Sequence, residues 1–408
     1  MITTVILFII YFAFISLGLP DSVLGAALPA ISRQWGLQLS DGSLASMLIV
    51  GSTVVSSFMS GHIIEKVGTG RITFLSCLLT AGALMGISFA PAFLWLLILA
   101  VPLGLGGGAV DSALNNYVAV HYESRHMNWI HSFWGVGATL GPVLMSFSLS
   151  TFGSWQSGYR LISIIQFVFT LVLLFSLPLW KKADRENQKK TEDPADGRDA
   201  PEISSVESTD RRENVFRIKG VWLAFVFLIL YSVVEGGLGL WGSSFLVQSR
   251  GFSIERAAFW ISFYFGGITL GRFLSGFISM KLNNTQMLRG GLLIALGGLI
   301  LIALPLPKIL TVAAMILTGF GLAPVFPAML HETPNRFGRS SSQILIGYQM
   351  GFAYLGSTLL NPLLGVILQL TNPALLPWIL MVLSFLMIFT SGLLIAVTNS
   401  GDTVGYEH

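Results

Sequence analysis

Carboxyl, amide and imidazole side chains lie inside two apolar stretches of this chain. Asp111 and Asn115 follow a run of glycines, and His131 lies in the next apolar stretch. An Asp at the depth of a lipid bilayer costs about 2.5–3.5 kcal/mol on insertion scales. Chains keep such groups there chiefly where the groups line a cavity or a pathway. These residues therefore predict a buried polar site that binds ions and polar solutes.

Asp111 and Asn115 are four residues apart, so a helix places them on one face. Gly104 and Gly108 continue that face, and small residues allow another helix to approach closely. Burial favours the neutral form of a carboxyl group. Asp111 could therefore take up a proton on one side of a membrane and release it on the other, while Asn115 and Asn116 bind a polar substrate. The alternative is a structural hydrogen-bond network at a helix contact.

His131 and Trp134 lie about one helical turn apart in the following stretch. The imidazole could donate to a substrate hydroxyl or relay a proton, and the indole could stack against a substrate ring. Both residues also have a purely structural interpretation, in which the histidine bonds to a neighbouring helix and the tryptophan fills core space. We expect both to contribute to the substrate site.

Two further acids lie near the middle of apolar runs. Asp21 lies between Pro20 and Pro29, and Glu235 begins the glycine-rich sequence EGGLGLWG. We expect both runs to be broken helices, which would allow bending near a gate. Each acid is interpreted as a gate, a second ion-coupling group or part of a structural network. Arg272 could pair with one of these acids, but we expect its side chain to extend to the membrane surface.

A polar stripe follows one face of a late apolar run. Gln343, Tyr354 and Asn361 fall within about 40° of one another at 100° per residue, and Tyr348 and Gln349 lie on adjoining faces. Amides donate and accept hydrogen bonds, and aromatic rings cover apolar C–H faces, so this set suits a neutral polyol. Hydrogen bonding between helices is the alternative, especially for Asn361.

The composition indicates a membrane protein. Of 408 residues, 53% are hydrophobic and 11% are charged, whereas a soluble protein carries about 25% charge. A run of about 20 apolar residues spans the hydrocarbon core as one helix. We therefore expect an all-α protein with twelve spans, at 3–31, 42–65, 71–89, 93–118, 127–151, 159–180, 219–247, 257–281, 287–305, 308–330, 342–370 and 374–398.

One segment divides the chain into two parts. Residues 181–219 hold 20 of the 43 charged residues and contain no long apolar run, which predicts a flexible charged linker. Its basic residues favour the cytoplasm. The expected organisation is a six-helix bundle at 1–180, a cytoplasmic linker at 181–219 and a second six-helix bundle at 220–408, with both termini cytoplasmic.

The two expected bundles resemble each other in sequence. Gly51–Gly61 matches Gly266–Gly276 at an offset of 215, and the same offset relates two pairs of single glycines: Gly104 with Gly319, and Gly106 with Gly321. Two six-helix halves related by an axis along the membrane normal are typical of the major facilitator type of secondary transporter.

The loop after the second run supports that resemblance. The sequence GHIIEKVGTGR contains Glu65, Lys66 and Arg71 and is similar to the loop signature of the major facilitator superfamily, with one extra residue before Arg71. The resemblance implies a gate in which these charges pair across helix ends. A short hydrophilic turn with positive-inside charges is the alternative.

The stretches GAVDSALNNYV and MNWIHSFWGVGATLGP resemble the fourth and fifth helices of the fucose–galactose–hexose symporter family. Asn116 stands where that family often has proline. The resemblance implies import of a small sugar by alternating access, coupled to a proton or a sodium ion, with Asp111 as the coupling acid. It also implies a bacterial inner or plasma membrane. A proton-coupled exporter of drugs or metabolites on the same fold is the closest alternative.

Other classes fit less well. The chain contains no HExxH or GxSxG motif and one cysteine, so we expect neither an enzyme nor a bound metal or other cofactor. A receptor without transport would usually carry a folded soluble domain. The net charge of +3 fits loop cations that face anionic lipid, so we expect the lipid bilayer and a sugar as partners, no nucleic acid, and a monomer.

Overall fold

The computed structural model describes residues 2–122, 124–192 and 215–399. These residues form α-helices and short 3-10 helices, and the expected all-α class with twelve candidate membrane spans is confirmed. In chain order the elements are α1 (Ile2–Asp21), α2 (Val23–Trp35), α3 (Leu39–Val67), α4 (Thr69–Ile87), α5 (Phe93–His121), α6 (Ser124–Phe152), α7 (Trp155–Glu192), η1 (Val215–Arg217), α8 (Val221–Arg250), α9 (Ile254–Ile278), α10 (Asn284–Ala303), α11 (Lys308–Leu322), α12 (Val325–His331), α13 (Thr333–Phe337), α14 (Arg339–Leu370), η2 (Pro373–Leu375) and α15 (Leu376–Asn399).

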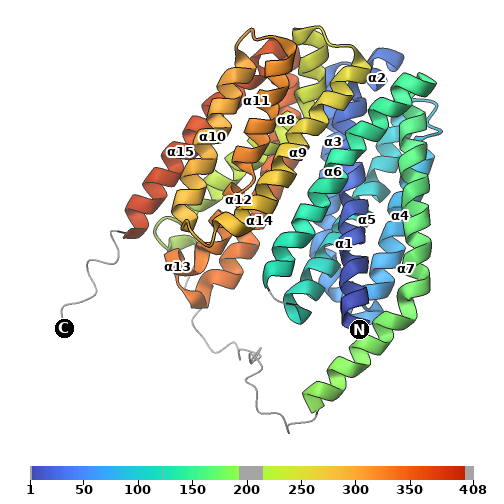
Figure 1. Ribbon diagram of the computed structural model, residues 1–408, viewed down its shortest axis with the longest axis vertical. Helices are drawn as coiled ribbons and strands as arrows, with labels where there is room; N and C mark the ends of the chain where they lie inside the picture. Colours follow the sequence, from blue (N-terminus) through green and yellow to red (C-terminus); the bar gives the residue numbers. More distant parts are fainter. Residues whose placement is uncertain (1, 123, 193–214, 400–408) are drawn as a thin grey trace.

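The helices form two bundles, which we call the N half (α1–α7) and the C half (α8–α15). Figure 1 shows the blue and green helices of the N half beside the yellow and red helices of the C half. Contacts between α6 and α9, α3 and α14, and α2 and α8 join the two halves. We call the end where α7 finishes and η1 begins the linker side, and the opposite end the distal side.

The sequence repeat corresponds to a repeat in space. A Cβ added to Gly104 of α5 would lie 2.1 Å from the carbonyl oxygen of Ile49, and one added to Gly319 of α11 would lie 2.1 Å from that of Tyr264. Ile49 and Tyr264 differ by the same offset of 215 as the two glycines. Each half therefore uses the same backbone-to-backbone contact between equivalent helices, because only glycine allows so close an approach.

A second glycine pair follows the same rule. Gly106 packs against Thr80 of α4, and Gly321 packs against Ala295 of α10. These partners are again 215 residues apart. The expected pseudo-symmetry therefore extends over three helices in each half: α3, α4 and α5 correspond to α9, α10 and α11.

The breaks in the helices agree only partly with expectation. The first span is broken at Ser22, between α1 and α2. The expected break near Glu235 is wrong, because α8 is continuous from Val221 to Arg250. That segment contains no proline. Gly25 of α2 lets the two helices approach closely, because a Cβ added there would lie 2.4 Å from the carbonyl oxygen of Gly239. An unexpected break separates α11 from α12 at Pro324.

The expected linker, residues 181–219, overlaps the described helices at both ends. Residues 181–192 continue α7, and Val215–Arg217 form η1. Residues 193–214 lie outside the described part of the chain.

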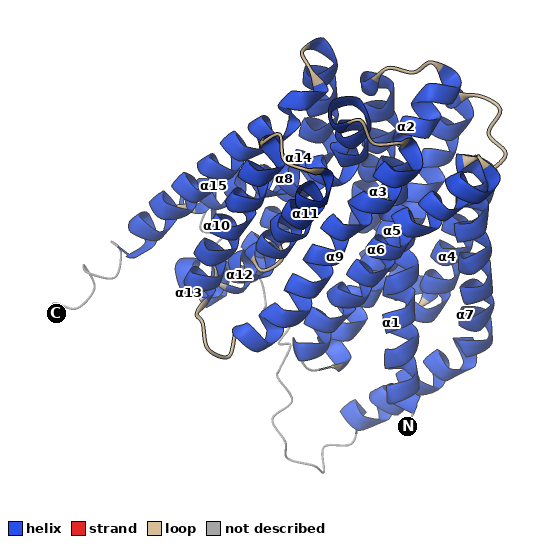
Figure 2. Cartoon of the chain, turned by 45° about the horizontal axis from the view of Figure 1, so that its top comes forward, coloured by secondary structure: helices blue, strands red, loops and turns tan. Residues whose placement is uncertain are grey.

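Hydrogen bonds between the halves concentrate on the distal side. Ser43 Oγ donates to the Pro362 carbonyl over 3.0 Å, Ser40 N donates to Gln369 Oε1 over 2.8 Å, and Ser146 Oγ donates to the Glu255 carbonyl over 2.8 Å. We call this set the distal seam. Figure 2 turns the distal end toward the viewer, where α2 and α3 lie among the helices of both halves.

The halves separate toward the linker side. On α14, a Cβ added to Gly365 would meet Ser43 of the N half at 2.4 Å, whereas those on Gly351 and Gly347 meet no atom within 4 Å. The described structure is therefore closed on the distal side.

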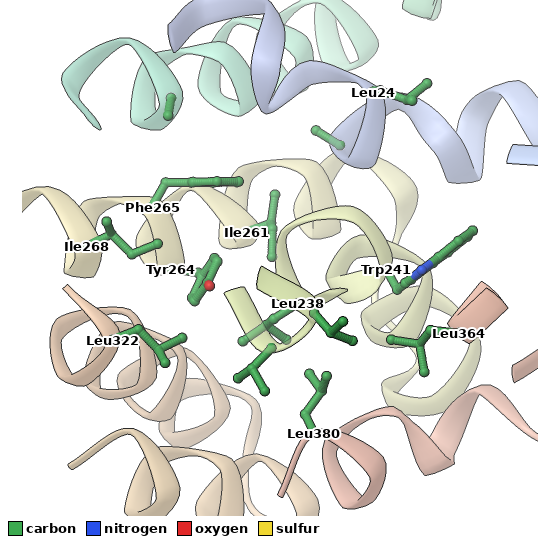
Figure 3. Close-up of a cluster of buried hydrophobic side chains, with 14 of the residues drawn as sticks. Leu24, Leu238, Trp241, Ile261, Tyr264, Phe265, Ile268, Leu322, Leu364 and Leu380 are labelled. Carbon is green, nitrogen blue, oxygen red and sulfur yellow. The ribbon is translucent and has the colours of Figure 1, made fainter. Parts of the chain in front are cut away.

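Apolar packing holds the distal contacts in place. Figure 3 shows Leu24 on α2 of the N half, across from the C-half helices α9 and α8 that carry Ile261 and Leu238. These three side chains are almost fully buried, at 6%, 0% and 0% exposure. Burial of this kind stabilises by about 25 cal/mol per Å² of apolar surface that is removed from water, so the inter-half contact depends mainly on shape and apolar area.

Candidate functional site

Asp111 lies in the middle of the molecule, where α5 packs against α3. Asn115 Nδ2 donates to Asp111 Oδ1 over 2.9 Å and to the Asp111 carbonyl over 2.9 Å. Gly108 brings α3 close, because a Cβ there would lie 2.2 Å from the Thr53 carbonyl. The Tyr354 side chain of α14 faces the same carboxyl group from the C half. The expected pairing of Asp111 with Asn115 on one face is therefore present.

Asp21 lies at the break between α1 and α2 and interacts electrostatically with Asp111. Trp134 Nε1 of α6 donates to Asp21 Oδ2 over 2.7 Å. Gly18 explains this proximity, since a Cβ there would lie 2.1 Å from the Trp134 carbonyl oxygen. Asp21 is nevertheless exposed to solvent, although the ten residues that follow it are buried or nearly so. A solvent-accessible carboxyl group thus lies deep between the helices.

Glu235 and Arg272 form an ion pair within the C half. Arg272 Nη2 lies 2.9 Å from Glu235 Oε1, and the two side chains are 14% and 23% exposed. Tyr264 Oη donates to the Glu235 carbonyl over 2.9 Å. The expectation that Arg272 extends to the membrane surface is wrong. Its guanidinium instead binds the Glu235 carboxylate inside the C half, because a charge-assisted hydrogen bond stabilises a partly buried cation.

Trp134 connects the two acid sites. The Arg272 Cζ atom lies 5.1 Å from the centroid of the Trp134 ring, in a cation–π contact. Gly135 sets this geometry, because a Cβ there would lie 2.5 Å from Thr269 Oγ1 of α9. Thr139 Oγ1 also lies 3.2 Å from Thr269 Oγ1. The contact between α6 and α9 therefore places an N-half indole against a C-half guanidinium.

His131 lies one turn of α6 toward the linker side from Trp134. Its ring packs edge-on against Phe14 of α1 at a centroid distance of 5.8 Å. Arg272 is its nearest electrostatic partner. A neutral imidazole at this position can donate one hydrogen bond and accept another.

We call the side chains that the structure brings together the central cluster: Asp21, Asp111, Asn115, His131, Trp134, Tyr231, Glu235, Tyr264, Arg272 and Tyr354. It includes all three expected ion-coupling acids and four of the nine expected substrate-binding residues. It holds three carboxyl groups, one guanidinium and one imidazole, beside phenol and amide groups.

Three expected site residues lie outside the central cluster and make their contacts within the C half. Tyr348 packs against Phe216 with ring centroids 4.9 Å apart, and Gln349 is buried and accepts from Thr333 Oγ1 over 2.9 Å. Asn361 is buried, and its carbonyl accepts from Trp241 Nε1 over 3.0 Å. Hydrogen bonding between helices, the alternative to substrate binding, thus describes the contacts of Gln349 and Asn361. Both side chains bond to residues of the C half.

The remaining expected residues lie apart from the central cluster. Asn116 is exposed, on a different face of α5 from Asp111. Lys66 and Arg71 are exposed at the linker side, and Arg71 lines a pocket of about 410 Å³ between α4 and α7. The side chains of Glu65 and Gln343 lie outside the described part of the structure, so the expected gate pairing and that end of the polar stripe stay predictions.

Sequence reasoning missed Tyr231 and Tyr264. Both hydroxyl-bearing rings are almost fully buried, at 2% and 0% exposure, and both lie against the ion pair of Glu235 and Arg272. One signal was available: Tyr231 precedes Glu235 by four residues and so shares its helix face. No equivalent signal existed for Tyr264, whose proximity depends on the crossing of α8 and α9.

Relatives of known name align with much of the chain. It is 23% identical over 279 residues to Bypass of stop codon protein 6 of Saccharomyces cerevisiae, with 66% of this chain and 56% of that protein covered. The chain thus spans little more than half the length of that relative. It is 24% identical over 282 residues to the glucose/mannose transporter GlcP of Bacillus subtilis, with 67% of each covered. It is 22% identical to the 4-hydroxybenzoate transporter PcaK of Acinetobacter baylyi over 67% of this chain and 64% of that one.

Solved structures share the fold. A bacterial homolog of the human lysosomal transporter Spinster, in an inward-facing and unoccupied conformation, matches with a TM-score of 0.69, 15% identity, and coverage of 98% of this chain and 96% of that chain. The nucleoside transporter NupG (D323A mutant) matches with a TM-score of 0.75, 12% identity, and coverage of 95% and 98%. The model of the Major Facilitator Superfamily matches residues 10–360. With twelve candidate spans in two bundles, this chain is an integral, multi-pass membrane protein that belongs to the Major Facilitator Superfamily.

Proposed function

We propose that this protein imports a small neutral sugar together with a proton by alternating access. The observation that carries the proposal is the position of Asp21 and Asp111. One carboxyl group is solvent-accessible and the other is held by Asn115, and both lie beside Tyr354 where the two halves meet. Intramembrane acids in such positions are functional by default.

The chemistry of the central cluster supports a neutral substrate. The cluster holds three carboxyl groups and one guanidinium, and that guanidinium already pairs with Glu235 at 2.9 Å. A carboxylate substrate would add a fourth acid to a site of low dielectric constant, where like charges repel strongly. Hydroxyl groups instead match the free lone pairs and N–H groups of Asn115 and His131. The glucose/mannose transporter among the relatives agrees with this class.

An organic acid is the second candidate, and Arg272 is the observation that favours it. A guanidinium in the middle of the molecule is the usual partner of a substrate carboxylate, and one relative is a 4-hydroxybenzoate transporter. For this substrate to bind, Glu235 would have to release Arg272 or become protonated. The neutral sugar requires no such change, which is why we favour it.

Alternating access agrees with the asymmetry of the structure. The halves meet along the distal seam and separate toward the linker side, where Gly347 and Gly351 face open space. With the linker in the cytoplasm, as its basic residues favour, this arrangement would open inward. Sugar and proton would bind from the outside in the opposite arrangement, and the empty carrier would return.

Uptake by proteoliposomes tests the proposal. Labelled glucose, mannose and fucose are offered under an inward proton gradient, an inward sodium gradient and no gradient, with 4-hydroxybenzoate as a parallel substrate. We expect accumulation of at least one sugar above its outside concentration under the proton gradient alone. Accumulation of 4-hydroxybenzoate in place of every sugar would favour the second candidate. Sugar or drug efflux driven by the reverse gradient would favour an exporter, and sugar binding without any flux would favour a receptor.

A further inference from the structure

Trp134 touches a charged group of each half at the same time. Its indole N–H donates to Asp21 Oδ2 over 2.7 Å, and its ring face lies against Arg272, with Cζ 5.1 Å from the centroid. Arg272 is in turn bound to Glu235 at 2.9 Å. Four side chains thus form a continuous row from the acid of α1 to the acid of α8.

Along this row, the anion lies at the edge of the Trp134 ring and the cation lies at its face, and both positions are electrostatically favourable. An aromatic ring has a positive edge and a negative face, so its N–H edge attracts an anion and its face attracts a cation. An ionised Asp21 therefore strengthens its own bond to the indole, because hydrogen bonds to charged acceptors are roughly twice as strong as neutral ones. It also attracts Arg272 through the ring. A protonated Asp21 would lose both effects.

The backbone holds this row in register. Gly18 of α1 lies against the Trp134 carbonyl, and Gly135 lies against Thr269 of α9. Glycines at both contacts keep α1, α6 and α9 close, so the indole stays between Asp21 and Arg272. A change in the ionisation of Asp21 therefore changes the attraction between α6 and α9.

We propose that Trp134 is a positioning residue that transmits the ionisation state of Asp21 to Arg272, and so favours the arrangement with a closed distal side while Asp21 is ionised. The inference rests on the proposed function in one respect, namely that Asp21, beside Asp111, takes up and releases a proton during transport. The inference replaces the expected role of Trp134 in stacking against a substrate ring, because its N–H group and one ring face already contact Asp21 and Arg272.

Other charged and titratable groups also face this row. Asp111 of α5 and Tyr354 of α14 lie near Asp21, and His131 of α6 lies near Arg272. On the far side, Tyr231 and Tyr264 lie against the ion pair of α8 and α9. Each of these can shift the midpoint of a pH response. Among the contacts of the described residues, those of Trp134 reach both Asp21 and Arg272, so its substitution should uncouple the response from the inter-half equilibrium.

Distance measurements without substrate test the inference. Spin labels are placed at Lys66 and Lys281, exposed residues near the linker side of α3 and α9 that differ by the repeat offset, in a background where the buried Cys77 is replaced by serine. The distance distribution is then recorded across a pH series in nanodiscs. The ratio of long to short distances should rise about tenfold from low to high pH, the change expected for one charge-assisted hydrogen bond.

Trp134→Phe is the decisive variant, because it keeps an aromatic face for Arg272 and removes the N–H donor. We expect the pH response of this variant to be flattened at least threefold. Asp21→Asn should give a flat response, and adding Trp134→Phe to Asp21→Asn should change nothing further. The matched control is Trp129→Phe on the same helix, whose 39% exposed ring should leave the response intact.

A wild-type pH response in Trp134→Phe would overturn the inference, as would additive effects of Trp134→Phe and Asp21→Asn. Trp134→Leu removes the ring face as well and should shift the ratio further, in the same direction as protonation. Because no sugar is present, a failure of the proposed function is seen separately. In that case the wild type still shows the pH response of the distances and Trp134→Phe still lacks it, while proteoliposomes take up no sugar.

Discussion

Arg272 Nη2 and Glu235 Oε1 lie 2.9 Å apart between α9 and α8. Both residues belong to the C half, so their pair is kept when the halves move relative to each other. Asp21 and Asp111 have no guanidinium at hydrogen-bond distance among the described contacts. The ion pair of Arg272 and Glu235 therefore connects α9 to α8 within the C half, whereas Asp21 and Asp111 are the acids that we propose to bind protons.

Replacing Glu235 should destabilise the protein. In Glu235→Gln, Arg272 loses its carboxylate partner at low exposure, and an unpaired buried donor costs about 1–3 kcal/mol. We expect a lower unfolding temperature in detergent, measured by intrinsic fluorescence. The double variant Glu235→Gln with Arg272→Gln should recover part of the loss, because two neutral amides leave no buried charge. Equal unfolding temperatures for wild type and Glu235→Gln would contradict a structural pair.

Asp111→Asn should separate exchange from accumulation. The amide keeps the shape of the side chain but cannot bind or release a proton. Bound sugar can therefore still cross the membrane, but the proton gradient no longer drives its accumulation. We expect exchange of labelled for unlabelled sugar near the wild-type rate and no uphill uptake. Asp41→Asn is the control, since Asp41 only caps α3 at the distal side, where it accepts from Gln38 N. Unaltered accumulation in Asp111→Asn would remove Asp111 from the coupling role.

His131→Ala should weaken sugar binding. Loss of one neutral hydrogen bond costs about 0.5–1.5 kcal/mol, which corresponds to a roughly three- to tenfold rise in Kd. Calorimetry on the purified protein measures it. His121→Ala is the control, because His121 contacts the Tyr117 carbonyl near the linker end of α5 and should leave Kd unchanged. An unchanged Kd in His131→Ala would exclude it from the sugar site.

Alanine at the repeated glycine contact should destabilise both halves. In Gly104→Ala and Gly319→Ala the new Cβ meets a carbonyl oxygen at 2.1 Å, and overpacking of this kind costs about 1–3 kcal/mol. Gly82→Ala and Gly297→Ala place a Cβ with no atom within 4 Å, so helix propensity should leave them neutral or slightly stabilised. Unfolding temperatures of the four variants check this. A loss in the two control variants of the same size would mean that the close contact is not the cause.

Much of the fold could be predicted from the sequence. Apolar runs of the length of a bilayer gave the twelve spans. The offset of 215 related Gly104 to Gly319, and the structure gives these two glycines equivalent contacts, with Ile49 and Tyr264. Proline positions explain the remaining differences. Pro20 precedes a real break, whereas the glycines after Glu235 serve a helix contact and leave α8 continuous.

The central cluster could be predicted only where its members share one helix. Asp111 with Asn115 follows from a spacing of four residues, and so could Tyr231 with Glu235. Trp134 with Arg272 could not, because that contact depends on the close crossing of α6 and α9 at Gly135. Gln349 and Asn361 were misleading for a related reason: a polar side chain in a membrane helix can bond within its own half as well as face a pathway.

The distal seam consists of hydroxyl and amide groups that bond to carbonyl oxygens and to one another, as in Ser43 with Pro362. Such neutral bonds are unaffected by mobile ions, in contrast to surface charge pairs, which weaken as the Debye length shortens. The hydrogen bonds of the distal seam should therefore keep their strength from low to high ionic strength.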